Sequence, residues 1–255
     1  MKKGEKKQYW SFKAAAKEGD GELYIYGEIT SWQWDDSDTS ANSFKRELDA
    51  LGDISTLHLY INSPGGIVTE GVTIGNMLKR HKARVIVHVD ALAASVASVI
   101  AMAGDEIHMP RNAMMMIHNP WRVTAGNADD HRKSAEDLDR IGGSMKQTYL
   151  DRSGDKLDET KLTELLDAET WLSAQECLDY GLCDVVGDAN QAAACVSDEL
   201  FAKYRNVPKG LTTIQPDEPN ASVGTKEREY LQNIAATAKT ELQNLNSYLG
   251  GILNG

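Results

Sequence analysis

The stretch from Arg84 to Met102 reads RVIVHVDALAASVASVIAM, and the interpretation of the whole chain depends on it. Its first six residues are a β-branched run of the kind that forms a buried strand. The remainder carries two serines, Ser95 and Ser98, in a run of alanines. Small residues allow a helix to pack closely against a sheet. The serines are therefore either packing residues or include a nucleophile at the start of a helix, and the rest of the sequence has to decide.

Size and charge limit the possible functions. The 255 residues can bury one substantial core, so we expect one main α/β domain with an appendage. The balance of 27 Lys+Arg against 38 Asp+Glu gives a net charge of −11, which repels a phosphate backbone, and we expect no nucleic-acid partner. No apolar run approaches the roughly 20 residues that span a bilayer, and the N-terminus has no hydrophobic secretory segment. We expect a cytoplasmic protein without a membrane partner.

The cysteines give no sign of a metal or disulfide framework. There are three, Cys177, Cys183 and Cys195, and none is part of a paired C-x-x-C pattern. Buried free thiols are the expected state. We predict no disulfide, no metal site and no cofactor.

Short β-branched or aromatic runs alternate with helical patterns along the first half of the chain. We expect helices at residues 43–52, capped by Ser43, and 68–80, where apolar residues recur at helical spacing. A helix at 173–180 should lead into a last strand. This alternation predicts a mainly parallel sheet flanked by helices. The other expected strands cover residues 22–27, 56–62, 84–89, 106–109 and 114–118.

A strongly charged stretch from residue 127 to about residue 150 predicts one long amphipathic helix. Leu138, Ile141, Met145 and Tyr149 recur at steps of three or four residues on one face. The helix is either an ordinary packing helix or an arm that contacts another subunit.

The ends of the chain differ in composition from its middle. Residues 1–20 begin with four lysines and are expected to be a mobile arm, ahead of a main domain at 21–205. Three prolines among Thr, Gly, Asp and Asn indicate a linker at 206–224. Leucines at helical spacing then predict a helical tail at 225–255.

Ser95 lies where a catalytic nucleophile is commonly found. A strand followed at once by a helix leaves unpaired backbone N–H groups at the helix start. Such groups can bind the oxyanion that forms when a hydroxyl attacks a carbonyl. The turn INSPGG at residues 61–66 offers a second donor, because Gly65 and Gly66 leave their N–H groups unshielded.

A serine nucleophile needs a base and a group that orients the base. Of the six histidines, His118 alone ends an apolar run and precedes a loop, at NPW, from where a side chain can reach a cleft. The other five lie inside strand patterns or on charged helical surfaces. Asp167 and Glu169 precede Trp171 and are the candidate carboxylates.

Taken together, these segments resemble the Clp protease proteolytic subunit family of serine peptidases. INSPGG, ALAASVASVIAMAG, RNAMMMIHNP and TWLSAQECLDYGLCD occur in the family's order, and the resemblance covers about Leu23 to Val186. It implies Ser95 as nucleophile, His118 as general base, and the N–H groups of Gly66 and Val96 as the oxyanion hole. The family's third residue is an aspartate two positions before the aromatic residue. Glu169 stands there in this chain, which leaves Asp167 as the alternative.

The resemblance also implies a fold and a substrate. The fold is of the Clp/crotonase type, with repeated β-β-α units and a protruding handle helix, through which family members form rings that stack and enclose their active sites. A polypeptide substrate would lie extended between two segments and add a strand to each, and no cofactor is needed. The segments expected to contact it contain Gly65, Ile67, Val68, Trp121 and Arg122.

Within the family, the chain resembles the head maturation (prohead) proteases of phages and prophages. The features are YWSFKAAAKEGDGELYIYGEI, SVIAMAG, MIHNPW and ETWLSAQE. Those enzymes process capsid or scaffold proteins inside a procapsid, in the host cytoplasm, without an unfolding ATPase. Cellular relatives dock the ATPase partly through aromatic residues near the S-P-G-G turn. Here Tyr60 is kept, but the neighbouring strand position is His58, and Arg80 stands at the end of the following helix, where the family has an aromatic residue. We therefore expect no Clp ATPase partner.

Three alternatives stay open from the sequence. One is a housekeeping Clp peptidase that works with an AAA+ unfoldase. Another is a relative of the signal-peptide peptidases, which the lack of a membrane segment and of a lysine base disfavours. The third is a catalytically inactive structural protein that kept the fold.

Overall fold

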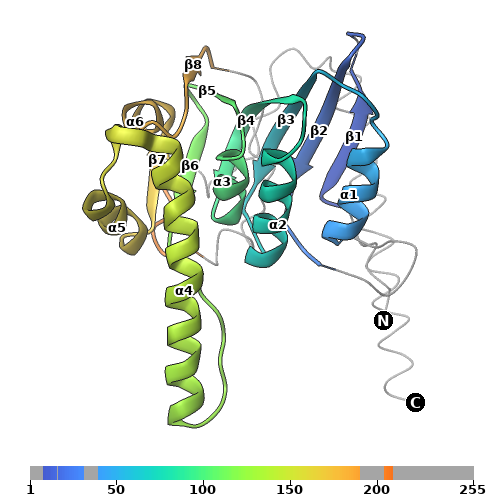
Figure 1. Ribbon diagram of the computed structural model, residues 1–255. Helices are drawn as coiled ribbons and strands as arrows, with labels where there is room; N and C mark the ends of the chain where they lie inside the picture. Colours follow the sequence, from blue (N-terminus) through green and yellow to red (C-terminus); the bar gives the residue numbers. More distant parts are fainter. Residues whose placement is uncertain (1–7, 16, 32–39, 190–203, 209–255) are drawn as a thin grey trace, which may run out of the picture. The chain divides into compact units, whose positions relative to one another are not determined.

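The computed structural model describes residues 8–15, 17–31, 40–189 and 204–208, and the statements below concern those residues. One eight-stranded sheet organises them (Figure 1). The strands follow the order β1-β2-β3-β4-β5-β8, while β6 pairs with β4 and β7 pairs with β6. The strands are β1 Trp10–Ala14, β2 Asp20–Tyr26, β3 Thr56–Ser63, β4 Arg84–Ala94, β5 Glu106–Pro110, β6 Met114–Ile117, β7 Thr170–Ser173 and β8 Val185–Gly187.

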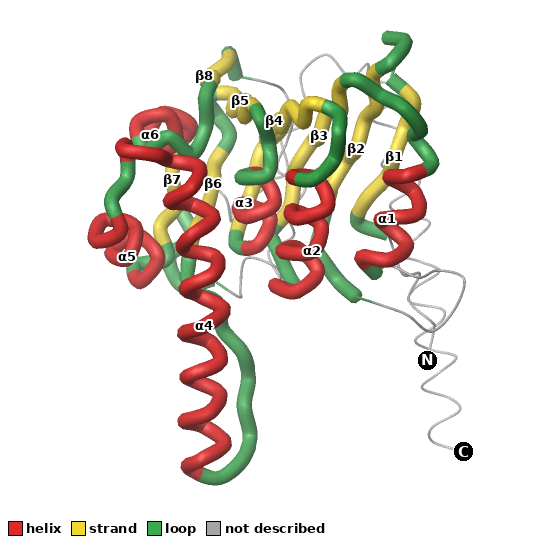
Figure 2. Tube along the Cα trace, viewed as in Figure 1, coloured by secondary structure: helices red, strands yellow, loops and turns green. Residues whose placement is uncertain are grey.

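The predicted α/β class is confirmed. Strands β2, β3, β4, β5 and β8 pair in parallel, and only the β1–β2 and β6–β7 pairs are antiparallel. Helices α1, α2 and α3 lie on one face of this sheet (Figure 2). The helices are α1 Ala41–Asp49, α2 Val68–Lys79, α3 Val96–Ala101, α4 Ala128–Ser153, α5 Glu159–Asp167 and α6 Ala174–Asp179, with a 3₁₀ turn at Gly154–Lys156.

Alternation along the central strands builds the core. Leu59, Val87 and Ile107 are fully buried under the helices, while neighbours such as Tyr60 and His88 point to the opposite face. Because Gly71 has no side chain, α2 can approach α3 closely: a Cβ there would lie 2.3 Å from Val96 Cγ2.

Strand β4 is longer than the sequence indicated. The expected strand ended at residue 89, but β4 continues to Ala94. The reason is a second pairing partner. Beyond the last residue paired with β5, residues Leu92 to Ala94 pair in parallel with β6. Ser95 therefore stands at the junction of strand and helix, with no intervening turn.

Two further corrections concern the N-terminal part. Residues 1–20 were expected to form a mobile arm, but β1 lies within them and pairs with β2, and Trp10 is buried in edge-on contact with Phe44. Helix α1 starts at Ala41 after Ser40, and Ser43 lies inside the helix, where its hydroxyl donates to the Ser40 carbonyl. Polar residues around a five-residue strand hid β1 from the sequence analysis.

The expected handle helix is present as α4. Asn127 caps it in a reciprocal arrangement with Asp130. Its C-terminal half packs on the core through buried Met145 and Tyr149. Its N-terminal half extends away from the sheet, with the preceding loop alongside it (Figure 2).

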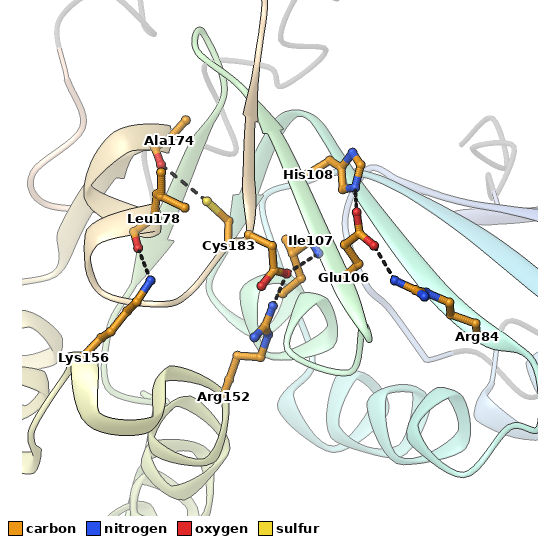
Figure 3. Close-up of polar contacts among 10 residues, drawn as sticks. Arg84, Glu106, Ile107, His108, Arg152, Lys156, Ala174, Leu178 and Cys183 are labelled. Atoms are coloured by element: carbon orange, nitrogen blue, oxygen red, sulfur yellow. Dashed lines mark hydrogen bonds and ion pairs between the residues drawn. The ribbon is translucent and has the colours of Figure 1, made fainter.

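Polar contacts fasten the C-terminal elements to the sheet (Figure 3). Arg152, near the end of α4, pairs with Asp184, and the Asp184 carboxylate also accepts the Ile107 N–H of β5 at 2.7 Å. Cys183 lies 3.5 Å from the carbonyl of Ala174 in α6. Helix α5 and strand β7, which the sequence analysis did not predict, belong to this part of the fold.

Some of the expectations from the sequence concern the cysteines and the C-terminal part of the chain. Cys177 and Cys183 are buried free thiols, as expected, whereas Cys195 lies outside the described residues. The predicted tail helix at 225–255, and the predicted linker beyond residue 208, also lie outside them. Among the described helices, none combines the length and apolarity needed to cross a bilayer.

Candidate active site

Ser95 occupies a strained elbow between β4 and α3. Its φ of 55° and ψ of −130° are rare for a residue with a side chain. The surrounding structure holds it there, because its N–H donates to the Met116 carbonyl at 2.8 Å and its neighbours are locked into the β4–β6 pairing. The hydroxyl is thereby presented at the start of α3.

His118 meets this hydroxyl from the end of β6. Its Nε2 lies 2.7 Å from Ser95 Oγ. Burial lowers the pKa of the imidazole; the charge of Glu169 opposes this shift, and the charge of Arg205 reinforces it. A lowered pKa keeps the ring neutral at pH 7, so that it can accept the serine proton.

Two backbone N–H groups beside Ser95 are unused. Val96 is the first residue of α3, so its N–H has no acceptor inside the helix. Gly66 bridges to Ile29, but the bonds run through the Gly65 carbonyl and the Ile67 N–H. In the part of the chain that the structure describes, neither N–H donates to another group, so both can serve an oxyanion.

The two glycines before α2 are required by close packing. At Gly65, with φ +90°, a Cβ would lie 2.6 Å from the Ala94 carbonyl and 2.7 Å from Ser95 Cβ. At Gly66, with φ +149°, it would lie 2.0 Å from the Ile29 carbonyl oxygen. A side chain at either position would push the turn away from the elbow.

Ser98 has a structural place. It is fully buried, its hydroxyl donates to the Ser95 carbonyl at 2.5 Å, and its Oγ lies 2.7 Å from the Tyr149 hydroxyl. It therefore braces the elbow and joins it to α4. Of the two serines in the alanine-rich run, only Ser95 faces an imidazole.

The candidate carboxylates have different partners. Asp167 accepts a hydrogen bond of 2.7 Å from the side chain of Asn119. Glu169 lies close enough to His118 for its charge to raise the imidazole pKa. Its Oε1, however, accepts the backbone N–H groups of Arg205 and Asn206, at 2.5 and 3.0 Å. Within the described residues, no hydrogen bond joins either carboxylate to His118.

Ser95 and His118 open into a cavity of about 420 Å³. Gly65, Ile67, Val68 and Trp121, expected to contact substrate, all line it. Arg122 instead lines an adjoining cavity of about 740 Å³, which also contains Glu169, and pairs with Asp137 of α4.

Tyr204 is a lining residue that the sequence analysis missed. Its ring stands edge-on to His118, with centroids 5.6 Å apart, and it contributes to the same cavity as Ser95. No signal in the sequence marks it, because it is separated by 86 positions from His118 and belongs to no recognisable motif.

A hydroxyl bonded to a buried neutral imidazole, beside two free backbone donors, is the arrangement with which serine hydrolases attack carbonyl groups. Comparison with known proteins narrows this class. The family model described as Clp protease matches residues 30–190, which is more than half of the chain. The chain therefore belongs to the Clp protease family of serine peptidases.

Individual relatives agree with this assignment. The chain is 33% identical over 160 residues to an ATP-dependent Clp protease proteolytic subunit of Streptococcus agalactiae serotype V, covering 60% of this chain and 81% of the relative. It is 34% identical over 161 residues to the protein of the same name from Streptococcus salivarius, with the same two coverages.

Replacing Ser95 by Ala should lower peptidase activity on the order of 10⁶-fold, because the attacking atom is removed. Ser98→Ala is the matched control. It should keep most of the activity and lose about 1–3 kcal/mol of stability, since the buried Tyr149 hydroxyl is left without a partner. Turnover of a fluorogenic peptide and thermal unfolding measure the two effects. An inactive, folded Ser98→Ala with an active Ser95→Ala would contradict the assignment.

The activity should persist into mildly acidic solution. His118 must be neutral to accept the proton, and its pKa is lowered from 6.5 by burial. As pH falls, kcat/KM should therefore decline through a midpoint below 6.5. A pH profile of kcat/KM checks this, and a midpoint above 6.5 would show that the imidazole is not desolvated.

The two carboxylates can be separated by isosteric amides. Glu169→Gln should lower kcat more than Asp167→Asn, because only Glu169 acts electrostatically on His118. Loss of an orienting carboxylate reaches about 10⁴-fold in related triads. Steady-state kinetics of both variants gives the comparison, and equal small losses would mean that another group orients His118.

Proposed function

We propose that the protein is a serine endopeptidase that works through an acyl-enzyme. The contact that carries this proposal is the 2.7 Å separation between Ser95 Oγ and His118 Nε2, on an elbow flanked by free N–H groups. Membership of the Clp protease family supports it.

The proposed steps use only groups of the chain and the substrate. His118 Nε2 takes the proton of Ser95 Oγ as this oxygen attacks the carbonyl carbon of the peptide. The developing oxyanion accepts the N–H groups of Gly66 and Val96. His118 then gives its proton to the leaving amine, which departs and leaves Ser95 acylated. His118 next takes a proton from water as the water oxygen attacks the acyl carbon. The bond to Ser95 Oγ breaks, His118 returns the proton to this oxygen, and the carboxylic acid product leaves.

The cavity suits an extended polypeptide. On one side, Ile67 is 42% exposed, and on the other Trp121 is 58% exposed. Exposed apolar side chains that line a cavity are features by which an extended peptide is recognised. The substrate would contact residues 65–68 and the loop that starts at Trp121.

An unfolded protein such as casein tests the activity. The native chain should cut it at internal bonds, and Ser95→Ala should not. Mass spectrometry of the products identifies the cleaved bonds. Equal cleavage by both proteins would assign the activity to a contaminant, and removal of terminal residues alone would contradict endopeptidase action.

We further propose that the protein is a homo-oligomeric ring in which the handle helix α4 contacts a neighbouring copy. The N-terminal half of α4 extends beyond the sheet and carries half-buried Leu138. An apolar residue on a projecting helix is stabilised by a partner surface. Light scattering should therefore show one large species, and Leu138→Glu should shift it toward smaller ones. A monodisperse monomer at high concentration would refute this arrangement.

Two cellular roles are compatible with this chemistry. The names of the curated relatives, ATP-dependent Clp protease proteolytic subunits, support work with an AAA+ unfoldase. The head maturation features of the sequence support processing of capsid or scaffold proteins without such a partner.

The face of the sheet opposite helices α1, α2 and α3 bears on this choice. Tyr24 stacks on Tyr60, and Tyr60 stacks on His88, with ring centroids 4.7 and 4.8 Å apart. His58 and His108 extend this aromatic row on either side of His88. An apolar ATPase loop docking there would have to desolvate imidazoles and the neighbouring Glu106, which favours the role without an ATPase.

Co-expression separates the two roles. In cells that lack Clp ATPases, the protein should still trim its capsid or scaffold substrate, and Ser95→Ala should not. Loss of trimming in those cells, restored by supplying a Clp ATPase, would establish the housekeeping role.

A further inference from the structure

The chain segment Tyr204–Pro208 lies against the candidate active site, 86 positions beyond His118 at its first residue. Tyr204 lines the cavity of Ser95, and Arg205 and Asn206 line the adjoining one. No expectation from the sequence assigns this segment a place there. Its contacts with the cavity walls show what it does to the site.

The phenol of Tyr204 reaches across the catalytic cavity. Its hydroxyl donates to the Pro64 carbonyl, in the turn that also holds the oxyanion-hole Gly66. Its oxygen also lies close to the Ser95 side chain, which opposes the rise in the pKa of Tyr204 that burial causes. The ring is packed edge-on between His118 and Trp171, with centroid distances of 5.6 and 5.9 Å. A substrate carbonyl has to enter the cavity beside Ser95 Oγ, and the phenol of Tyr204, which lines that cavity, takes up part of the space.

The backbone of the segment engages the candidate orienting carboxylate. Glu169 Oε1 accepts both the Arg205 and the Asn206 N–H groups, at 2.5 and 3.0 Å. The Asn206 side chain also donates to the Ala168 carbonyl at 2.7 Å. Glu169 is thereby held by the segment and has no hydrogen bond to His118 within the described residues.

Arg205 and Val207 add a charge and an apolar contact to the interaction of the segment with the site. The Arg205 guanidinium disfavours a positive charge on His118, yet an imidazolium must form when the serine proton is transferred. Val207 packs against the buried cluster of Leu92, Ala94 and Met116. The segment is thus anchored by hydrogen bonds to Pro64, Ala168 and Glu169 and by apolar contact.

We propose that residues 204–208 are an intramolecular inhibitor that occupies the substrate site of the resting enzyme. This inference rests on the proposed serine peptidase function. A side-chain hydroxyl, rather than a peptide carbonyl, faces Ser95, so the segment blocks the site and is not itself positioned for cleavage. Substrate binds when the segment withdraws, and the apparent affinity falls in proportion to the fraction of open sites.

The pocket filled by Tyr204 also defines a substrate preference. It accepts a planar ring between His118 and Trp171 and offers the Pro64 carbonyl to a hydroxyl at the end of that ring. A polypeptide that displaces the segment with a tyrosine reproduces these contacts. Substrates with tyrosine at this subsite should therefore be cleaved faster than those with alanine.

The test compares rates of labelling by a fluorophosphonate, which reacts with an activated serine without needing a peptide sequence. Tyr204→Ala should be labelled at least about tenfold faster than the native chain, as expected if fewer than about one native site in ten is open. Tyr204→Phe, which keeps the ring but not the hydroxyl, should give an intermediate rate. Tyr24→Ala removes a tyrosine that stacks on Tyr60, away from the cavity of Ser95, and should match the native rate. Ser95→Ala should not be labelled.

The outcomes separate this proposal from the function on which it rests. If the native chain and Tyr204→Ala, both folded by thermal unfolding, are labelled at equal rates, the inhibitor role is wrong while the serine peptidase function stands. Slower labelling of Tyr204→Ala would show that the segment supports the site, which also overturns the proposal. If neither is labelled, the proposed function itself fails.

Discussion

The approach of the Gly65 backbone to Ser95 is the constraint on which the site depends. The elbow can hold its unusual φ of 55° only because β4 is locked to β6 on one side and meets the side-chain-free turn on the other. This one contact brings Ser95, the Gly66 N–H and the start of α3 together. Strand β4 extends beyond its pairing with β5, and its last residues, Leu92 to Ala94, pair with β6.

The parts of the candidate site that depend on local chemistry could be predicted from the sequence. The small residues around Ser95, the adjacent glycines and a histidine at a strand end each have a local cause, and the structure brings these elements together. The length of β4 could not be read in the same way, because Ala91 to Ala94 has no strand-forming residues and is ordered by its partner. Strand β1 was missed for a similar reason: it is only five residues long and is stabilised by pairing with β2 and by the burial of Trp10.

The candidate orienting carboxylate shows where sequence position stops being informative. Glu169 stands two positions before Trp171, and its charge raises the pKa of His118. Its hydrogen bonds, however, come from the backbone N–H groups of Arg205 and Asn206. A carboxylate oxygen that accepts two backbone N–H groups is stabilised where it is, so Glu169 can turn toward His118 only after these hydrogen bonds break. Long-range contacts of this kind leave no pattern in the sequence, because any residue supplies a backbone N–H group.

The central claim is that His118 activates Ser95, and mapping a covalent adduct tests it most directly. After reaction with a fluorophosphonate, peptide mass spectrometry should find a single adduct on Ser95, formed by the native protein and absent from a folded His118→Ala variant. An adduct on Ser98 or on another serine, or undiminished labelling of Ser95 without the histidine, would contradict the account.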